Sequence, residues 1–438
     1  MFVLSILLVQ MAVILVTARV LGWVFGRLHQ QQVIGEVTAG LVLGPSLLGW
    51  LAPRTFAVLF PPSSLDFINA LSQIGLIVFM FLVGLELSPD VLRKRGQSAL
   101  IISHTSMIVP FLLGSLLAIF LYPKLSAASV PFTSFVLFFA ISMSITAFPV
   151  LARILTDRDM LGTSLGTVAL AAAAINDVTA WCILAGVVLL VGAGASGLPL
   201  WVTALGACAY AVFMVFVGRR WLRKLSTHEL RESFPQARFA LILLAVLVSA
   251  LITESLGLHP MFGAFLIGAV MPKDSFFVTK VKNRLEDMAV VLLLPLYFAF
   301  TGLRTSVALI SGPVTLIYFG LILLVAIGGK FCGAFLASRL SGMSWREAGS
   351  IGVMMNTRGM VELVVLNIGL DIGVISHLVF TLLVLMAIIT TCMTTPLLDL
   401  VHPVDTINLV LLELGKTISQ RSSRNVTVRF RCFDKFDY

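Results

Sequence analysis

The sequence predicts an all-helical membrane protein with about thirteen transmembrane helices. Three observations support this fold class: 59% of the 438 residues are hydrophobic, only 12% are charged, and the mean hydropathy is +1.04. A helical span needs roughly 20 apolar residues, so the chain has room for on the order of a dozen spans joined by short loops. The same composition excludes a soluble enzyme and a disordered chain.

Apolar segments follow one another along the chain as far as residue 398. Strands of a membrane barrel would be shorter and would alternate in polarity, so helices are favoured. The segments lie near 2–24, 33–50, 68–87, 98–122, 132–152, 163–193, 198–218, 239–256, 259–272, 288–303, 311–338, 347–369 and 373–398. We expect a membrane domain over 1–398 and a short polar cytoplasmic tail over 399–438.

The distribution of basic residues between the loops predicts the orientation. Eighteen Lys and Arg residues lie in loops that follow odd-numbered segments, whereas three lie in loops that follow even-numbered ones: Arg54, Lys124 and Arg304. Cytoplasmic loops carry the excess of basic residues. We therefore expect the N-terminus outside and the C-terminus in the cytoplasm. This orientation accounts for most of the +9 formal charge, so no nucleic-acid partner is expected.

The sequence contains no motif for a cofactor or for catalysis. Its five cysteines are scattered without a CxxC pair, which argues against disulfide, zinc and iron–sulfur frameworks. Phosphate-binding, dinucleotide-binding and HExxH motifs are also absent from it. The first apolar run has no basic region before it, so it reads as a span rather than a signal peptide. We expect no cofactor and no enzyme activity.

Asp177 is the sharpest candidate for an ion-binding residue. It lies beside Asn176, far from either end of its apolar segment and without a basic residue one helical turn away. A charge near the bilayer centre costs about 2.5–3.5 kcal/mol on insertion scales. Such a residue persists where it pairs, lines a wet cavity or carries ions. A buried carboxylate can hold a proton or a cation; the alternative is a carboxylic acid bonded to a neighbouring helix.

Two segments are interrupted by polar residues at membrane depth. In the first, Pro149 frees a backbone carbonyl, and the hydroxyls of Ser144 and Thr146 suit a monovalent cation; a simple proline kink is the alternative. In the second, Arg358 and Glu362 stand one turn apart and can pair. The two segments are separated by an odd number of segments, so they run in opposite senses. Such a pair indicates an inverted-repeat secondary transporter with its site near the midplane.

Three further charges lie in or beside the spans. Lys330 falls in the middle of its segment, where we expect it to pair with Asp177 or with carbonyls of the first broken helix. Glu36 and Glu86 lie near the predicted cytoplasmic boundary. They form either a vestibule for cations or ordinary interfacial acids.

Seven stretches spread over nearly the whole membrane region carry a family resemblance. They are QVIGE to GPS at 32–46, FLVGLEL at 81–87, SITAFPVLARIL at 144–155, AAAAINDVTAW at 171–181, HPMFGAFLIGAVMPK at 259–273, LLPLYFAFTGLRT at 293–305 and MNTRGMVELVVLNIG at 355–369. With these motifs the chain resembles the monovalent cation:proton antiporter-2 family, nearest its plant- and fungal-type cation/proton exchangers and their bacterial relatives.

The resemblance implies a sodium/proton-antiporter-like fold of thirteen helices in two inverted repeats with crossing broken helices. A core domain, with helices near 98–193 and 311–398, would move against a dimerisation domain, so a homodimer is expected. Many relatives carry a large cytosolic regulatory domain. The roughly 40-residue tail leaves no room for one, so either such regulation is absent or the sequence is a truncated form of a longer chain.

The resemblance also assigns roles to residues. Asp177 matches the carboxylate that binds cation and proton, Asn176 its neighbour, and Thr146 the broken helix that completes the site. Lys330 matches a core lysine that competes with the cation for the carboxylate. Positions treated as functionally sensitive in the family match Arg304, Arg358 and Glu86. An Asn–Asp pair, in place of two aspartates, suggests one proton per cation.

The expected function is antiport of K⁺ or Na⁺ against H⁺ by alternating access around Asp177, in the lipid bilayer of a bacterial plasma membrane. One alternative is a cation channel-like efflux system gated by a cytosolic partner, although no TVGYG-like filter sequence occurs. Another is a proton-coupled organic-solute transporter. The compact polar residues of the predicted site favour a small ion.

Overall fold

The computed structural model describes residues 3–28, 30–86, 96–158, 160, 163–192, 199–223, 236–273 and 275–401. Within these ranges the regular structure is helical and contains no strand. The helices are α1 (Val3–Arg27), α2 (Gln32–Leu43), α3 (Leu48–Leu51), α4 (Pro53–Leu59), α5 (Pro62–Glu86), α7 (Gly96–Leu125), α8 (Phe132–Ser144), α9 (Phe148–Asp157), α10 (Ser164–Gly192), α11 (Leu200–Phe213), α12 (Arg219–Arg223), α13 (Gln236–Ser255), α14 (Pro260–Val270), α15 (Ser275–Met288), α16 (Leu294–Leu303), α17 (Pro313–Leu340), α18 (Trp345–Met354), α19 (Met360–Asp371) and α20 (His377–Val401).

Helical structure occupies each of the thirteen predicted apolar segments. Among the described residues, eleven helical stretches are long and apolar enough to cross a membrane. The two remaining segments are α14, which has 11 residues, and the pair α18 and α19, which have 10 and 12. The all-helical membrane fold is confirmed, whereas the count of thirteen spans stays a prediction.

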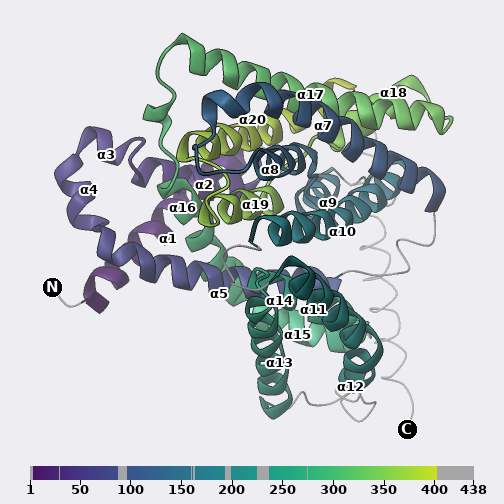
Figure 1. The fold of residues 1–438 in the computed structure, drawn as a ribbon, viewed down its shortest axis with the longest axis horizontal. Coiled ribbons are helices and arrows are strands. Elements are labelled where there is room, and N and C mark those ends of the chain that lie inside the picture. Colours follow the sequence, from purple (N-terminus) through teal and green to yellow (C-terminus); the bar gives the residue numbers. More distant parts are fainter. Residues whose placement is uncertain are drawn as a thin grey trace, which may run out of the picture.

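The helices pack in two groups (Figure 1). The first helix group contains α7, α8, α9 and α10 together with α17, α18, α19 and α20, and fills the upper part of the view. The second helix group contains α1, α2, α5, α13, α14 and α16. The first group covers the two regions expected to form a core domain. Movement of one group against the other stays a prediction.

Polar and apolar side chains are distributed as expected for a protein surrounded by lipid. Leu324 on α17 is 70% exposed and Val16 on α1 is 64% exposed, whereas Lys330 and Arg358 are fully buried. Exposed apolar side chains on a long helix face need a nonpolar environment to cover them. The charged groups instead lie inside the protein, where other polar groups can satisfy them.

Close backbone contact fixes the second helix group. A Cβ atom added at Gly40 of α2 would lie 2.0 Å from the carbonyl oxygen of Ala299 in α16.

The contact between α5 and α14 is stabilised by Lys273. Its ammonium donates to the carbonyls of Gly84 and Leu85, each at 2.9 Å, and to the carbonyl of Gly268 at 3.0 Å. Burial, with a contribution from the Arg219 charge, lowers the pKa of Lys273 to about 8. The ammonium form therefore still predominates at pH 7.

We expect Gly40→Ala to destabilise the protein by at least about 2 kcal/mol, because the new methyl group would overlap backbone atoms of α16, which cannot move away as a side chain can. Thermal unfolding of the purified protein in detergent measures the change. The matched control is Gly320→Ala in α17, where an added Cβ meets nothing within 4 Å. Equal unfolding temperatures for the two variants would contradict the prediction.

Candidate functional site

Two interrupted helices cross at the centre of the first helix group. Helix α8 ends at Ser144 and α9 begins at Phe148, while α18 ends at Met354 and α19 begins at Met360. The extended residues between the halves lie against each other. The Ala147 backbone N–H donates to the Thr357 carbonyl at 3.0 Å. Backbone that leaves the helical pattern at membrane depth must be satisfied by other protein groups, and each break here supplies partners for the other.

Thr146 ties the two breaks together through its side chain. Its hydroxyl is fully buried and donates to the carbonyl of Met355 at 2.9 Å. On the opposite side of the crossing, Gly359 has a φ of 154°, a conformation that a residue with a Cβ rarely adopts. A Cβ at that position would also lie 2.7 Å from the side chain of Val150. The crossing therefore depends on a hydroxyl in one break and on a glycine in the other.

Arg358 satisfies the C-terminal end of α8. Its guanidinium donates to the carbonyls of Ser142 at 2.9 Å and Met143 at 2.7 Å, and to Glu362 Oε1 at 3.0 Å. The last carbonyls of a helix have no partner within the helix and carry partial negative charge, so a buried cation is well placed there. The predicted Arg358–Glu362 pair is present, and both side chains are fully buried.

Asp177 lies on α10 beside the start of α9. Its Oδ2 accepts a hydrogen bond from the backbone N–H of Phe148 at 3.2 Å, and its side chain is only slightly exposed. The N-terminus of a helix favours a negative charge. The neighbouring Asn176 uses its Oδ1 to accept the backbone N–H of Thr146 at 3.0 Å. The predicted Asn–Asp pair thus binds the middle of the break, at Thr146, and the start of α9, at Phe148.

Two polar atoms of this pair are buried and lack a partner among the described residues. They are Oδ1 of Asp177 and Nδ2 of Asn176. A buried polar atom without a hydrogen bond is costly. An unpartnered carboxylate oxygen at this position is able to take a proton or to coordinate a cation.

Lys330 reaches the crossing from α17. Its ammonium donates to the hydroxyl of Thr146 at 2.5 Å and is fully buried. Its predicted partner was Asp177 or a carbonyl of the broken helix, but in this conformation its bond is to a hydroxyl of the crossing. Within the described residues no ion pair within 4.0 Å joins Lys330 to Asp177. Thr146 therefore lies between the lysine and the Asn176–Asp177 pair.

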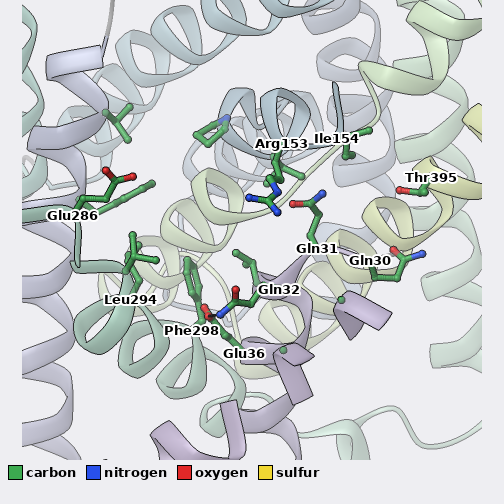
Figure 2. A pocket seen from close by; sticks show the side chains of 18 of the residues that line it. Gln30, Gln31, Gln32, Glu36, Arg153, Ile154, Glu286, Leu294, Phe298 and Thr395 are labelled. Carbon is green, nitrogen blue, oxygen red and sulfur yellow. Dashed lines mark hydrogen bonds between the residues drawn. The ribbon is translucent and has the colours of Figure 1, made fainter. Parts of the chain in front are cut away.

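A cavity of about 880 Å³ reaches the first turn of α9, and Figure 2 shows side chains that line it. It is lined by residues of α2, α5, α9, α15, α16 and α20, including the first residues of α9, Pro149 and Val150. These directly follow Phe148, whose N–H contacts Asp177. Arg153, Arg158 and Lys282 line it too, and the loop charges place them on the predicted cytoplasmic side.

The remaining predicted site residues are Glu36, Ser144 and Glu86, and each has a different outcome. Glu36 lines the cavity and accepts a hydrogen bond from Gln32 at 3.0 Å. The hydroxyl of Ser144 donates to Ala140 within its own helix at 2.8 Å, so its predicted role as a cation ligand stays a prediction. Glu86 is the last residue of α5, but its side chain lies outside the described part of the structure.

One polar cluster was missed by sequence reasoning. Arg304 at the end of α16 pairs with Asp371 at 2.6 Å and donates to Asn367 Oδ1 at 3.1 Å. Asn367 in turn donates to the Thr301 hydroxyl at 2.7 Å. The cluster joins α16 of the second helix group to α19 of the first. The spacing of Asn367 and Asp371, four residues apart in an apolar run, was an available signal because such residues share a helix face.

Two interrupted helices that cross beside a buried carboxylate define a membrane-transport fold built on inverted repeats. The family described as sodium/hydrogen exchanger, transmembrane, matches residues 13–400. The chain belongs to this sodium/hydrogen exchanger family, which confirms the resemblance seen in the motifs.

Individual relatives extend the comparison. The chain is 41% identical to Na(+)/H(+) antiporter NhaS4 of Synechocystis sp., covering 91% of this chain and 98% of that protein. It is 39% identical to Cation/H(+) antiporter 17 of Arabidopsis thaliana (97% and 50% covered) and 36% identical to K(+)/H(+) antiporter 1 of Saccharomyces cerevisiae (91% and 47%). The chain thus spans about half the length of these plant and yeast relatives.

The fold is shared with a solved structure. The sodium proton antiporter MjNhaP1 from Methanocaldococcus jannaschii, determined at pH 8, superposes with a TM-score of 0.64 over 94% of this chain and 99% of that one. Sequence identity between the two is 16%. The similarity confirms the predicted fold class.

We expect Arg358→Met to destabilise the protein by about 3–5 kcal/mol, because it removes one partner of a buried ion pair and leaves Glu362 uncompensated. The α8 carbonyls would lose their donor as well. Unfolding of the purified protein in detergent measures the loss. Adding Glu362→Gln to Arg358→Met should restore part of the stability, because the uncompensated charge is then gone. A double variant no more stable than Arg358→Met would argue against the pairing.

Proposed function

We propose that this protein exchanges a monovalent cation, K⁺ or Na⁺, for a proton across the membrane, with Asp177 as the shared binding group. The observation that carries the proposal is the unpartnered Oδ1 of Asp177 at the crossing of two broken helices. The curated relatives are named as antiporters of Na⁺, K⁺ or unspecified cations with H⁺, which supports a cation and a proton as the two ligands.

The cation and proton fluxes are coupled because both ligands bind the same carboxylate. A carboxylate that is protonated has lost the negative charge that attracts a metal cation, so the two occupancies exclude each other. A bare charge is costly to move through a low-dielectric barrier. A site that holds a proton or a cation therefore switches from one side of the membrane to the other more readily than an empty site. Each switch carries one ligand across the membrane. This proposal implies one proton per cation and no net charge movement.

Alternating access is supported by the asymmetry around Asp177. On one side the cavity approaches the start of α9. One helical turn further along α10, the buried Trp181 ring lies 6.3 Å from Phe262 and 6.4 Å from Phe265 of α14, centroid to centroid. These rings pack α10 of the first helix group against α14 of the second. Exposing Asp177 to the opposite side would require this contact to separate.

Lys330 and Thr146 can stabilise the site when neither a cation nor a proton is bound to Asp177. An ammonium close to an ionised carboxylate lowers the cost of burying it, and a bound cation would compete with that ammonium. Lys330 bonds to the hydroxyl of Thr146, the residue whose backbone N–H binds Asn176 and which lies two residues before Phe148, whose N–H binds Asp177. We propose that the lysine moves between this hydroxyl and the Asp177 carboxylate during the cycle.

The wider setting is also proposed. The 18 basic residues on alternate loops support a cytoplasmic C-terminus, and the cavity then faces the cytoplasm. We further propose a homodimer in a bacterial plasma membrane, with any regulator supplied as a cytosolic partner.

We expect Asp177→Asn to abolish cation-dependent proton movement in proteoliposomes, because an amide neither exchanges a proton in this pH range nor offers a charged oxygen to a cation. A pH-sensitive dye inside the vesicles reports the flux after addition of K⁺ or Na⁺. The matched control is Asp66→Asn, the same substitution on the exposed surface of α5, which should leave exchange unchanged. Wild-type exchange by the Asp177→Asn protein would refute the proposed mechanism.

We expect exchange at a fixed pH gradient to be insensitive to an imposed membrane potential, because one charge moves in each direction. The measurement compares initial rates with the potential clamped at zero and at a negative value, using a cation that the clamping ionophore does not carry. A rate that rises with the potential would show a different stoichiometry. Cation flux that ignores the proton gradient would instead indicate a channel.

A further inference from the structure

The cavity contains a carboxylate that the exchange step at Asp177 does not use. We infer that Glu36 forms a second site, a loading site for the monovalent cation on the cavity side of the membrane, from which the cation passes to Asp177. This inference deepens the proposed function and rests on it. Three features carry it: the pairing of the other carboxylates in the cavity, the bond of Arg19 to a backbone carbonyl, and the extension of the cavity to the start of α9.

Three carboxylates line the cavity: Glu36, Glu286 and Asp399. Two of them face a cationic side chain. Asp399 pairs with Arg158 at 2.7 Å, and Glu286 lies 3.7 Å from Lys282. The hydrogen bond to Glu36 comes instead from the neutral amide of Gln32, at 3.0 Å. Figure 2 shows Glu36 and Gln32 on one wall, apart from Glu286.

A cationic group whose charge acts on Glu36 is engaged elsewhere. Arg19 of α1 acts on Glu36 through its charge, but its guanidinium donates to the Val291 carbonyl at 3.0 Å, in the π-helical turn that precedes α16. No ion pair within 4.0 Å joins Arg19 to Glu36 in the described structure. The carboxylate of Glu36 thus has no cationic partner within 4.0 Å among the described residues, although the residue is just 4% exposed.

The cavity wall near Glu36 combines apolar side chains with groups that can bind a small cation. Much of the cavity wall is apolar, including Phe79, Leu82, Leu294 and Phe298. A charge set between low-dielectric walls attracts counter-ions more strongly than the same charge on an open surface. The Gln32 side chain next to it also has a carbonyl oxygen, a group that binds alkali cations readily.

The same cavity extends from Glu36 to the first turn of α9, beside the transport site. Its lining includes Glu36 on α2 and Pro149 on α9. Pro149 follows Phe148, whose backbone N–H binds Asp177. Since α2 belongs to the second helix group and α9 to the first, Glu36 would stay in place while Asp177 moves with its helices. A cation held at Glu36 is therefore available each time Asp177 faces the cavity.

The test uses sealed membrane vesicles of both orientations containing the full chain, with K⁺ or Na⁺ supplied to one face at a time. For Glu36→Gln we expect the KM for the cation on the cavity face to rise roughly tenfold, the lower end of the concentrating effect of a charged cleft. The maximal rate and the KM on the opposite face should not change. Glu36→Asp keeps the charge and should restore most of the cavity-face affinity.

The matched control is Glu286→Gln, which neutralises a carboxylate of the same cavity that already faces Lys282 and should leave KM unchanged on both faces. An unchanged cavity-face KM in Glu36→Gln vesicles would overturn the inference, and so would an equal rise on both faces. If Glu36→Gln fails to fold, Glu36→Asp still tests the inference. A full loss of cavity-face affinity in this variant, which keeps the carboxylate, would count against the inference. Exchange by Asp177→Asn would overturn the proposed function instead, so the two failures are distinguishable.

Discussion

The buried guanidinium of Arg358 is the interaction on which the rest of the central structure depends. Two helices are interrupted at membrane depth, where no water can satisfy the exposed backbone groups. Arg358 lies in the second break, donates to the terminal carbonyls of α8 at the first break, and pairs with Glu362 on α19. One side chain therefore satisfies a helix end and fixes the position of one break against the other. The positions of Thr146 and of the Asn176–Asp177 pair follow from that geometry.

The crossing also explains how a carboxylate is tolerated inside the first helix group. Asp177 receives a backbone N–H from the first turn of α9, an N–H that exists without a helical partner because the helix begins there. The same break exposes the Thr146 backbone to Asn176 and its hydroxyl to Lys330. The interruption that makes the helix unfavourable in lipid thus also supplies the groups of the proposed ion site.

Several parts of this arrangement could be predicted from the sequence, and others could not. The interruptions at Pro149 and around Arg358, and the isolation of Asp177, are visible locally, because polar residues stand out in apolar runs. The partner of Lys330 could not be predicted uniquely. The sequence left Asp177 and the carbonyls of the first broken helix as alternatives, and the structure joins Lys330 to the Thr146 hydroxyl. Arg304 was singled out, but its partners Asn367 and Asp371 on α19 escaped notice, because they lie in a different segment from Arg304.

The sequence by itself determined which segments are helical, where two of them break, and which family the motifs resemble, because hydrophobicity and helix interruption are properties of short stretches of chain. Only the tertiary structure decided which polar groups meet. The bonds of the crossing join residues far apart in the chain: Thr146 to Met355, Arg358 to Ser142 and Lys330 to Thr146. The order of residues along a helix cannot specify such contacts, because they depend on how separate helices cross and on which buried groups then lack any other partner.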